Sequence, residues 1–356
     1  MVQRSIQIIL LCLLATACTR GCDKSSREAT PDKSPKSLHL YIWGEYTSPE
    51  IFKDFETLTG IHVTESNFAS NEELLAKLQA GADGYDLIVP SDYMVAIMSQ
   101  MELLEPLDKA SIPNAKDIEP GLLGKQFDPA NKWSLPYSWA ITGIVFNKSK
   151  LKNPVISYKD LLSREDLKQR VSLLDDVREA MGAALKSNGA SLNATDDQHL
   201  EAAKATLITA KARIREFSST PVSLLKSGDL LAAQIYSNEA LRLAAQDSNF
   251  EFALPIDGFT FAIDNMVIPK NSRHKQEALT LINFLLSPDI NQKFAEQLLA
   301  APVVRGVREK LSQTLRQHPA ISQFEVIQAK GEMIRDLGPD IAKYDRIWTE
   351  VKAASL

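Results

Sequence analysis

The sequence contains very little cysteine and histidine. All three cysteines, Cys12, Cys18 and Cys22, lie within the first 22 residues, and the five histidines show no metal-ligand spacing. The rest of the chain therefore has no disulfide framework and no cysteine-based metal site. We expect neither a metal nor a cofactor.

Basic charge and catalytic motifs are scarce as well. The chain has 40 Lys and Arg against 45 Asp and Glu, for a net charge of -5, whereas a nucleic-acid binder usually presents a basic face. It contains no G-x-S-x-G, no H-E-x-x-H, no phosphate-binding loop and no suggestively spaced serine–histidine pair. These absences argue against an exported hydrolase, although two acids such as Asp176 and Asp264 could imitate a glycosidase pair.

The amino terminus carries a short apolar run. Residues 6–17 are apolar and follow Arg4; the run is too short for a permanent membrane span and is typical of a signal peptide. Leu-Ala-Thr-Ala directly before Cys18 resembles a bacterial lipoprotein box, so we expect a signal peptide at 1–17 and a lipid on Cys18. The alternative is an ordinary secretory signal with an incidental cysteine. Residues 18–37 are polar and indicate a flexible tether.

Two apolar segments with similar endings organise the next part of the chain. Leu38–Ile42 is followed by Trp-Gly-Glu-Tyr, and Asp86–Val89 by Pro-Ser-Asp-Tyr. With helices predicted at 50–59 and 72–80 and a strand at 61–64, the alternation predicts a parallel sheet covered by helices. Ligands of such sheets bind beyond the carboxyl ends of the strands. Aromatic rings beside carboxylates at that edge suit an organic cation.

The remaining sequence predicts a second α/β unit. At 356 residues, 44% of them hydrophobic, two domains are the natural expectation. Residues 133–145 are predicted to be extended and to cross to this unit, which runs over 148–251, and 261–269 predicts a strand that returns. The elements expected within and after the second unit are strands at 171–174 and 233–236 and helices at 176–186, 200–208, 223–232, 275–286 and 289–299. The C-terminal part is expected to be helical, with breaks near Pro319 and Pro339.

Taken in order, several motifs resemble one family over residues 38–350. They are Trp43-Gly44-Glu45-Tyr46, Ser70-Asn71-Glu72, Tyr85-Asp86-Leu87-Ile88-Val89-Pro90-Ser91, Phe127-Asp128-Pro129, Leu135-Pro136-Tyr137, Asp175-Asp176-Val177-Arg178-Glu179 and Leu281-Ile282-Asn283-Phe284-Leu285-Leu286-Ser287-Pro288. The family is the spermidine/putrescine-binding proteins of bacterial ABC importers. The resemblance implies a two-lobe α/β fold, each lobe a mainly parallel sheet flanked by helices, joined by crossover strands. Lobe 1 would comprise 38–140 and 262–308, and lobe 2 would comprise 144–258 and 312–356.

The resemblance also implies a site and its partners. Aromatic rings would flank the methylene chain of a polyamine, and carboxylates would take its ammonium groups. The matching positions are Trp43, Glu45, Tyr46, Ser91, Tyr93, Asp176, Glu179, Tyr236 and Asp264. The protein would be a monomer, exported and held at a bacterial membrane by its lipid. It would pass a polyamine to an ABC permease and bind no nucleic acid.

Four positions depart from the family pattern. Tyr236 and Ala262 stand where Trp is expected, Ile334 where Gln is expected, and Gly44 where a small hydroxyl residue is expected. Loss of an indole and an amide favours putrescine slightly over the longer spermidine. The alternative ligand is another small organic cation; an anion is disfavoured because acids dominate the site. A polyamine sensor is a further alternative.

Structural roles compete with binding at these positions. Trp43 and Tyr46 could be core aromatics, and Ser91 and Tyr93 could belong to a helix cap. Asp176 and Glu179 form a capping pattern. Asp264 lies in an apolar strand, and a buried carboxylate needs a partner. We expect a ligand ammonium there, with a neighbouring Lys or Arg as the alternative.

Overall fold

A computed structural model describes residues 36–354, which belong to one compact unit. The predicted signal peptide, Cys18 and nearly all of the predicted tether lie outside the described residues. Strands are β1 (Lys36–Trp43), β2 (Ile61–Phe68), β3 (Leu87–Ile88), β4 (Leu104–Glu105), β5 (Ser134–Asn147), β6 (Val171–Leu173), β7 (Glu216–Phe217), β8 (Ala232–Tyr236), β9 (Phe250–Ala253), β10 (Phe259–Pro269) and β11 (Gly331–Glu332).

The first strands form the parallel sheet that the sequence predicts. β1 pairs in parallel with β2 and with β3. The helices between them are α1 (Pro49–Thr59) and α2 (Asn71–Gln79), and the Oγ atoms of Ser48 and Ser70 accept backbone N–H groups at their starts. Gly60 ends α1 at φ 69°, a left-handed conformation that glycine adopts without strain. The third helix, α3 (Asp92–Gln100), begins four residues after β3.

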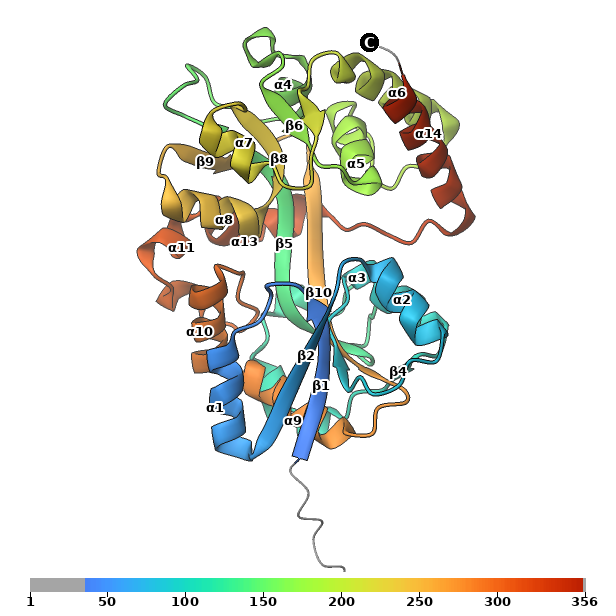
Figure 1. The fold of residues 1–356 in the computed structure, drawn as a ribbon, viewed down its shortest axis with the longest axis vertical. Helices are drawn as coiled ribbons and strands as arrows, with labels where there is room; N and C mark the ends of the chain where they lie inside the picture. The colour runs from blue at the N-terminus through green and yellow to red at the C-terminus, as the bar shows by residue number, and fades with distance from the viewer. Residues whose placement is uncertain (1–35, 355–356) are drawn as a thin grey trace, which may run out of the picture. The chain divides into compact units, whose positions relative to one another are not determined.

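Two long strands connect this sheet to a second parallel group. The strand order is β2-β1-β3-β10-β5-β8-β6-β7, with β6 parallel to β7 and β8, and with β10 antiparallel to both β3 and β5. β5 and β10 therefore belong to both strand groups, and they run side by side through the middle of the molecule (Figure 1). They are the crossover strands of a two-lobe α/β fold.

Helices cover the faces of both groups. Those of the second group and its surroundings are α4 (Tyr158–Ser163), α5 (Val177–Ser187), α6 (Asp197–Lys211), α7 (Val222–Ser227) and α8 (Ser237–Gln246). Later helices are α9 (Lys275–Leu285), α10 (Pro288–Leu298), α11 (Gln313–Gln317), α12 (Pro319–Ser322), α13 (Phe324–Lys330) and α14 (Ile341–Ala353), with short 3-10 turns at 109–111, 113–117, 120–122, 165–167, 308–310 and 338–340. The predicted C-terminal breaks coincide with the start of α12 and with the last 3-10 turn.

The apolar core of the described residues consists of several clusters. One cluster, which includes Leu173, Met181 and Tyr344, packs β6 against α5, α6 and α14. A larger cluster packs α1, α9 and α10 against β1 and continues along β5 and β10. A third lies between β1, β3 and α3. The larger cluster also includes Ala233 and Ile235 of β8 and Leu241 of α8, so it extends from one strand group to the other.

One predicted helix is wrong over part of its length. Residues 223–232 were expected to be a single helix, but α7 ends at Ser227 and β8 begins at Ala232. Gly228 ends the helix with φ 80°. Leu230 and Leu231 are buried, but they lie in the connection between α7 and β8 and not on a helix face. The domain bounds within the chain remain a prediction.

Gly143 provides a test of how closely β5 packs in the crossover. A Cβ at Gly143 would lie 2.4 Å from Phe252 Cζ and 2.8 Å from the Ala253 carbonyl oxygen. We predict that Gly143→Ala lowers the free energy of unfolding in urea by about 1–3 kcal/mol, the usual effect of overpacking. Gly182→Ala in α5 is the control. The added Cβ would lie 3.6 Å from Leu192 Cβ, which is an ordinary van der Waals contact. Equal stabilities for the two variants would contradict this account of β5.

Candidate ligand-binding site

Six residues of the paired crossover strands lie on one face of the sheet. Asp264 is opposite Ser138, Ala262 is opposite Ala140, and Thr260 is opposite Thr142. Alternate residues of a strand point to the same side, and directly opposed residues share that side. We call this set the crossover face. Its two ends are polar, and its middle consists of two partly exposed alanines.

Asp264 forms one end of the crossover face and is held by hydroxyl groups. Ser91 Oγ donates to Asp264 Oδ1 at 2.9 Å, and Tyr46 OH donates to Oδ2 at 3.1 Å. Burial raises the pKa of Asp264 to about 6, and these two hydrogen bonds oppose the rise. No Lys or Arg within residues 36–354 forms an ion pair with Asp264, so the alternative of a neighbouring cation is wrong for the described chain.

Glu179 lies at the other end and is held in the same way. Thr142 Oγ1 donates to Oε1 at 3.0 Å and Thr260 Oγ1 donates to Oε2 at 2.9 Å, and the residue is 5% exposed. Burial, with a smaller contribution from the negative charge of Asp176, raises the pKa of Glu179 to about 8. The two hydroxyl bonds and the charge of Arg178 act in the opposite direction.

Asp176, Tyr93 and Tyr236 surround the Glu179 end. Asp176 is exposed and caps α5, with Oδ1 accepting from the N–H groups of Arg178 (2.8 Å) and Glu179 (3.0 Å). This confirms the capping interpretation; a binding role remains a prediction. Burial raises the pKa of Tyr236, and the charges of Glu179 and Asp176 add to the rise. Burial and nearby Glu72 raise the pKa of Tyr93, with a smaller contribution from Asp176.

In the Trp-Gly-Glu-Tyr segment at the end of β1, Tyr46 contacts another predicted site residue, Asp264, whereas Trp43 and Glu45 form no hydrogen bond with the predicted site residues in the described chain. Tyr46 is buried and its ring packs edge-on against Tyr137, whose OH donates to the Tyr46 carbonyl at 2.7 Å. Trp43 is partly buried against Phe68, and its Nε1 is buried with no hydrogen-bond partner in the described chain. Glu45 is exposed at φ 55°. Within residues 36–354, no hydrogen bond joins Trp43 or Glu45 to the other predicted site residues.

The structure adds three acids that are not among the predicted site residues. Glu239 lies in the first turn of α8; its Oε2 is buried without a partner in the described chain, and its charge contributes to the raised pKa of Tyr236. Glu72 accepts a hydrogen bond from Tyr93 OH at 3.0 Å, and Asp92 is buried beside Asp264. Acids in the first turn of a helix are common because they suit the helix dipole, so this signal did not distinguish them.

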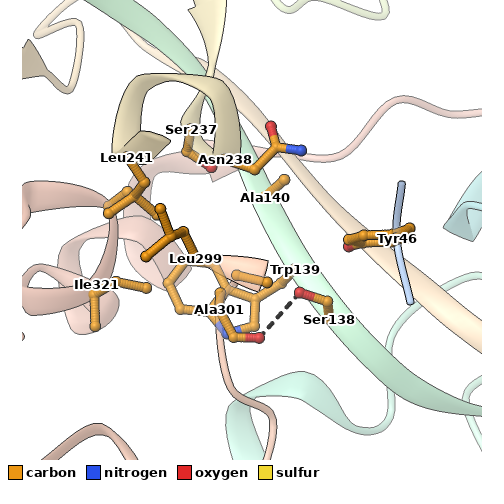
Figure 2. A pocket seen from close by; sticks show the side chains of 12 residues that line it. Tyr46, Ser138, Trp139, Ala140, Ser237, Asn238, Leu241, Leu299, Ala301 and Ile321 are labelled. Atoms are coloured by element: carbon orange, nitrogen blue, oxygen red, sulfur yellow. Dashed lines mark hydrogen bonds between the residues drawn. The ribbon is translucent and has the colours of Figure 1, made fainter. Parts of the chain in front are cut away.

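A small pocket borders the crossover face, and it is mostly apolar. Figure 2 shows Ser138 and Ala140 on its wall together with Leu241, Leu299 and Ile321, and Tyr46 at its edge. Ser138 Oγ turns away from the acids and donates to the Ala301 carbonyl at 3.0 Å. No carboxylate lines this pocket, so it does not provide the charge that a cation requires.

Comparisons with known proteins agree with this architecture. The family model for bacterial extracellular solute-binding proteins matches residues 50–323. The spermidine/putrescine-binding periplasmic protein of Salmonella typhimurium is 32% identical over 319 residues, which cover 89% of this chain and 92% of that protein. The putrescine-binding periplasmic protein PotF of Escherichia coli is 32% identical over 339 residues, covering 89% of this chain and 92% of that protein.

A solved structure supports the fold directly. The spermidine/putrescine ABC transporter substrate-binding protein PotD of Streptococcus pneumoniae superposes with a TM-score of 0.83 and 29% sequence identity, covering 89% of this chain and 98% of that one. This match confirms the two-lobe α/β fold that the sequence predicts. From the family model, the relatives and the fold together, the chain belongs to the bacterial extracellular solute-binding protein family.

Proposed function

We propose that this protein captures a polyamine, putrescine or spermidine, on the crossover face and delivers it unchanged to the membrane permease of an ABC importer. The observation that carries the proposal is the pair of carboxyl groups, Asp264 and Glu179, at opposite ends of that face. Within residues 36–354, the side-chain oxygens of each accept hydrogen bonds only from neutral hydroxyl groups. The names of the relatives, which are binding proteins and not enzymes, support the same function.

The spacing of the two acids favours a ligand with two cationic groups. Thr260, which contacts Glu179, lies four residues from Asp264 on β10, about 13 Å along the strand. A single ammonium contacts a carboxylate only within ~4 Å, so one charge cannot serve both ends. A chain with an ammonium at each end can do so, and Ala140 and Ala262 leave room for its methylene groups.

Aromatic and acidic neighbours make the same face suitable for removing such a chain from water. A desolvated ammonium is tolerated only beside acceptors and negative charge. Tyr46, Tyr93 and Tyr236 offer ring surface near the acids, and a cation over an aromatic face gains about 0.5–2 kcal/mol. Asp176 and the unpartnered Oε2 of Glu239 add negative charge near Tyr236. We assign binding roles to all nine predicted residues and add Glu239.

Export and anchoring complete the proposal. We infer that residues 1–17 direct export, that Cys18 carries a lipid, and that the chain works as a monomer at the outer side of a bacterial membrane. Relatives are named as periplasmic proteins, which supports export. None of the helices within residues 36–354 has the length and apolar character of a membrane span.

The first test is titration calorimetry of the purified protein with putrescine and with spermidine. We predict saturable binding of both at one site per chain, with putrescine the tighter ligand. The reason is that Ala262 and Ile334 offer neither an aromatic ring nor an amide to the additional aminopropyl arm. A clear preference for spermidine would refute the predicted preference for putrescine. If neither amine binds, the proposed function is refuted.

A single substitution tests the role of Asp264. Asp264→Asn keeps the size of the side chain but removes the charge that an ammonium would contact, so we predict a loss of well over tenfold in putrescine affinity by calorimetry. Asp128→Asn is the matched control. Asp128 is 3% exposed and accepts from the backbone N–H groups of residues 132–134, away from the crossover face. It should lose stability but retain affinity; unchanged binding by Asp264→Asn would exclude the assigned role.

The raised pKa values predict opposite pH trends for affinity and for stability. The pKa values of Asp264 and Glu179 are about 6 and about 8, whereas carboxyls in an unfolded chain titrate near ~4. Between these limits the folded protein holds protons that the unfolded chain has released, so the stability of the ligand-free protein falls as pH rises from 5 to 8. Putrescine requires ionised acids, so its affinity rises over the same range.

Calorimetry and urea unfolding in one buffer series measure both trends. The groups facing these acids are Tyr46, Tyr137 and Asp92 for Asp264, and Asp176, Arg178, Tyr158 and Tyr236 for Glu179. None of them is a histidine. An affinity that does not change between pH 5 and 8 would show that these acids do not hold the ligand.

A further inference from the structure

The start of α3 differs from the starts of the other early helices. Ser48 and Ser70 accept first-turn N–H groups at the starts of α1 and α2, but Ser91 at the same position of α3 makes no such bond. Its Oγ donates to Asp264 instead. The next residue, Asp92, supplies the missing acceptor, because its Oδ1 accepts from the Tyr93 N–H at 2.7 Å.

The second oxygen of Asp92 reaches the strand that carries Asp264. Oδ2 accepts from the Ile263 N–H at 3.1 Å, and the Asn265 N–H donates to the Pro90 carbonyl at 2.8 Å. Both chain neighbours of Asp264 are therefore bonded to the segment that opens α3. The pairing of β10 with β5 shifts register between Asp264 and Asn265. The pairing with β5 is therefore irregular at Asp264 and does not fix its position alone. The hydrogen bonds of Ile263 with Asp92 and of Asn265 with Pro90 hold the strand on both sides of Asp264.

We propose that Asp92 is a positioning residue for the ammonium-binding carboxylate of Asp264. It binds the backbone at Ile263 and caps α3, which leaves the Ser91 hydroxyl free to orient Asp264. Asp92 is 2% exposed and both of its oxygens accept backbone N–H groups, so it acts through Asp264 and not by touching a ligand. This inference rests on the proposed function and concerns the same site.

The arrangement also places two carboxyl groups close together. The charge of Asp264 contributes to the pKa of Asp92, which burial raises to about 7. Tyr93 N–H and Ile263 N–H are the only hydrogen-bond donors to Asp92 within the described chain, and both are neutral.

A double-mutant cycle between Asp92 and Asp264 tests the proposal. Asp92→Asn removes one of two buried acceptor atoms and the charge, so putrescine affinity should fall about tenfold when Asp264 is present. In the Asp264→Asn background the same change should alter the dissociation constant by less than about twofold, because a residue that acts only through Asp264 has nothing left to position. Calorimetry gives each dissociation constant, and the fitted stoichiometry gives the folded, competent fraction.

A role in stability alone would give a different result. Asp128→Asn, the control used above, should lower the unfolding temperature as Asp92→Asn does but leave affinity unchanged. Equal affinity losses for Asp92→Asn in both backgrounds would overturn the proposal. It would also be overturned if Asp92→Asn lost no affinity, or if Asp128→Asn lost as much affinity as Asp92→Asn. Failure of the unsubstituted protein to bind any diamine would instead refute the proposed function and this inference with it.

Discussion

The antiparallel pairing of β5 with β10 is the constraint on which the rest of the structure depends. These two strands belong to both sheet groups, so their register decides which residues of the two halves meet. It places Asp264 opposite Ser138 and Thr260 opposite Thr142, with two alanines between. A slip of one residue would turn every side chain to the other face of the sheet and would bring apolar residues such as Ile263 and Phe261 to the site.

The acids at the two ends of the crossover face, Asp264 and Glu179, share one physical feature, which is that their hydrogen-bond donors are neutral. Each carboxyl oxygen of Asp264 and Glu179 accepts one hydroxyl group, which leaves further acceptor positions open and does not neutralise the charge. An internal lysine or arginine would neutralise them and compete with a cationic ligand. A buried acid with hydroxyl partners can hold a proton when no cation is bound and release it when one arrives. The raised pKa values of these two groups follow from the same arrangement.

The sequence indicated the elements well because their signals are local. Ser48 and Gly60 mark the two ends of α1, and the alternation of apolar and helical segments predicted the parallel strands. The sequence indicated Ser91 and Asp264 as site residues but not the hydrogen bond between them. The two residues are 173 positions apart, and the pairing of β10 with β3 brings them together. The end of α7 was missed because Leu230 and Leu231 continue an apolar pattern beyond Gly228.

The acids that were not included in the predicted site show where sequence reasoning ends. Glu239 and Asp92 both lie in the first turn of a helix, where an acid is explained by the helix dipole alone. Nothing local distinguishes them from Glu50, which is exposed and paired with Lys293 at 2.9 Å. The difference lies in their surroundings: the Glu239 Oε2 is buried without a partner in the described chain, and Asp92 accepts an N–H from a strand 171 residues away. Tertiary packing, which only the assembled strands and helices provide, therefore distinguishes Glu239 and Asp92 from an exposed first-turn acid such as Glu50.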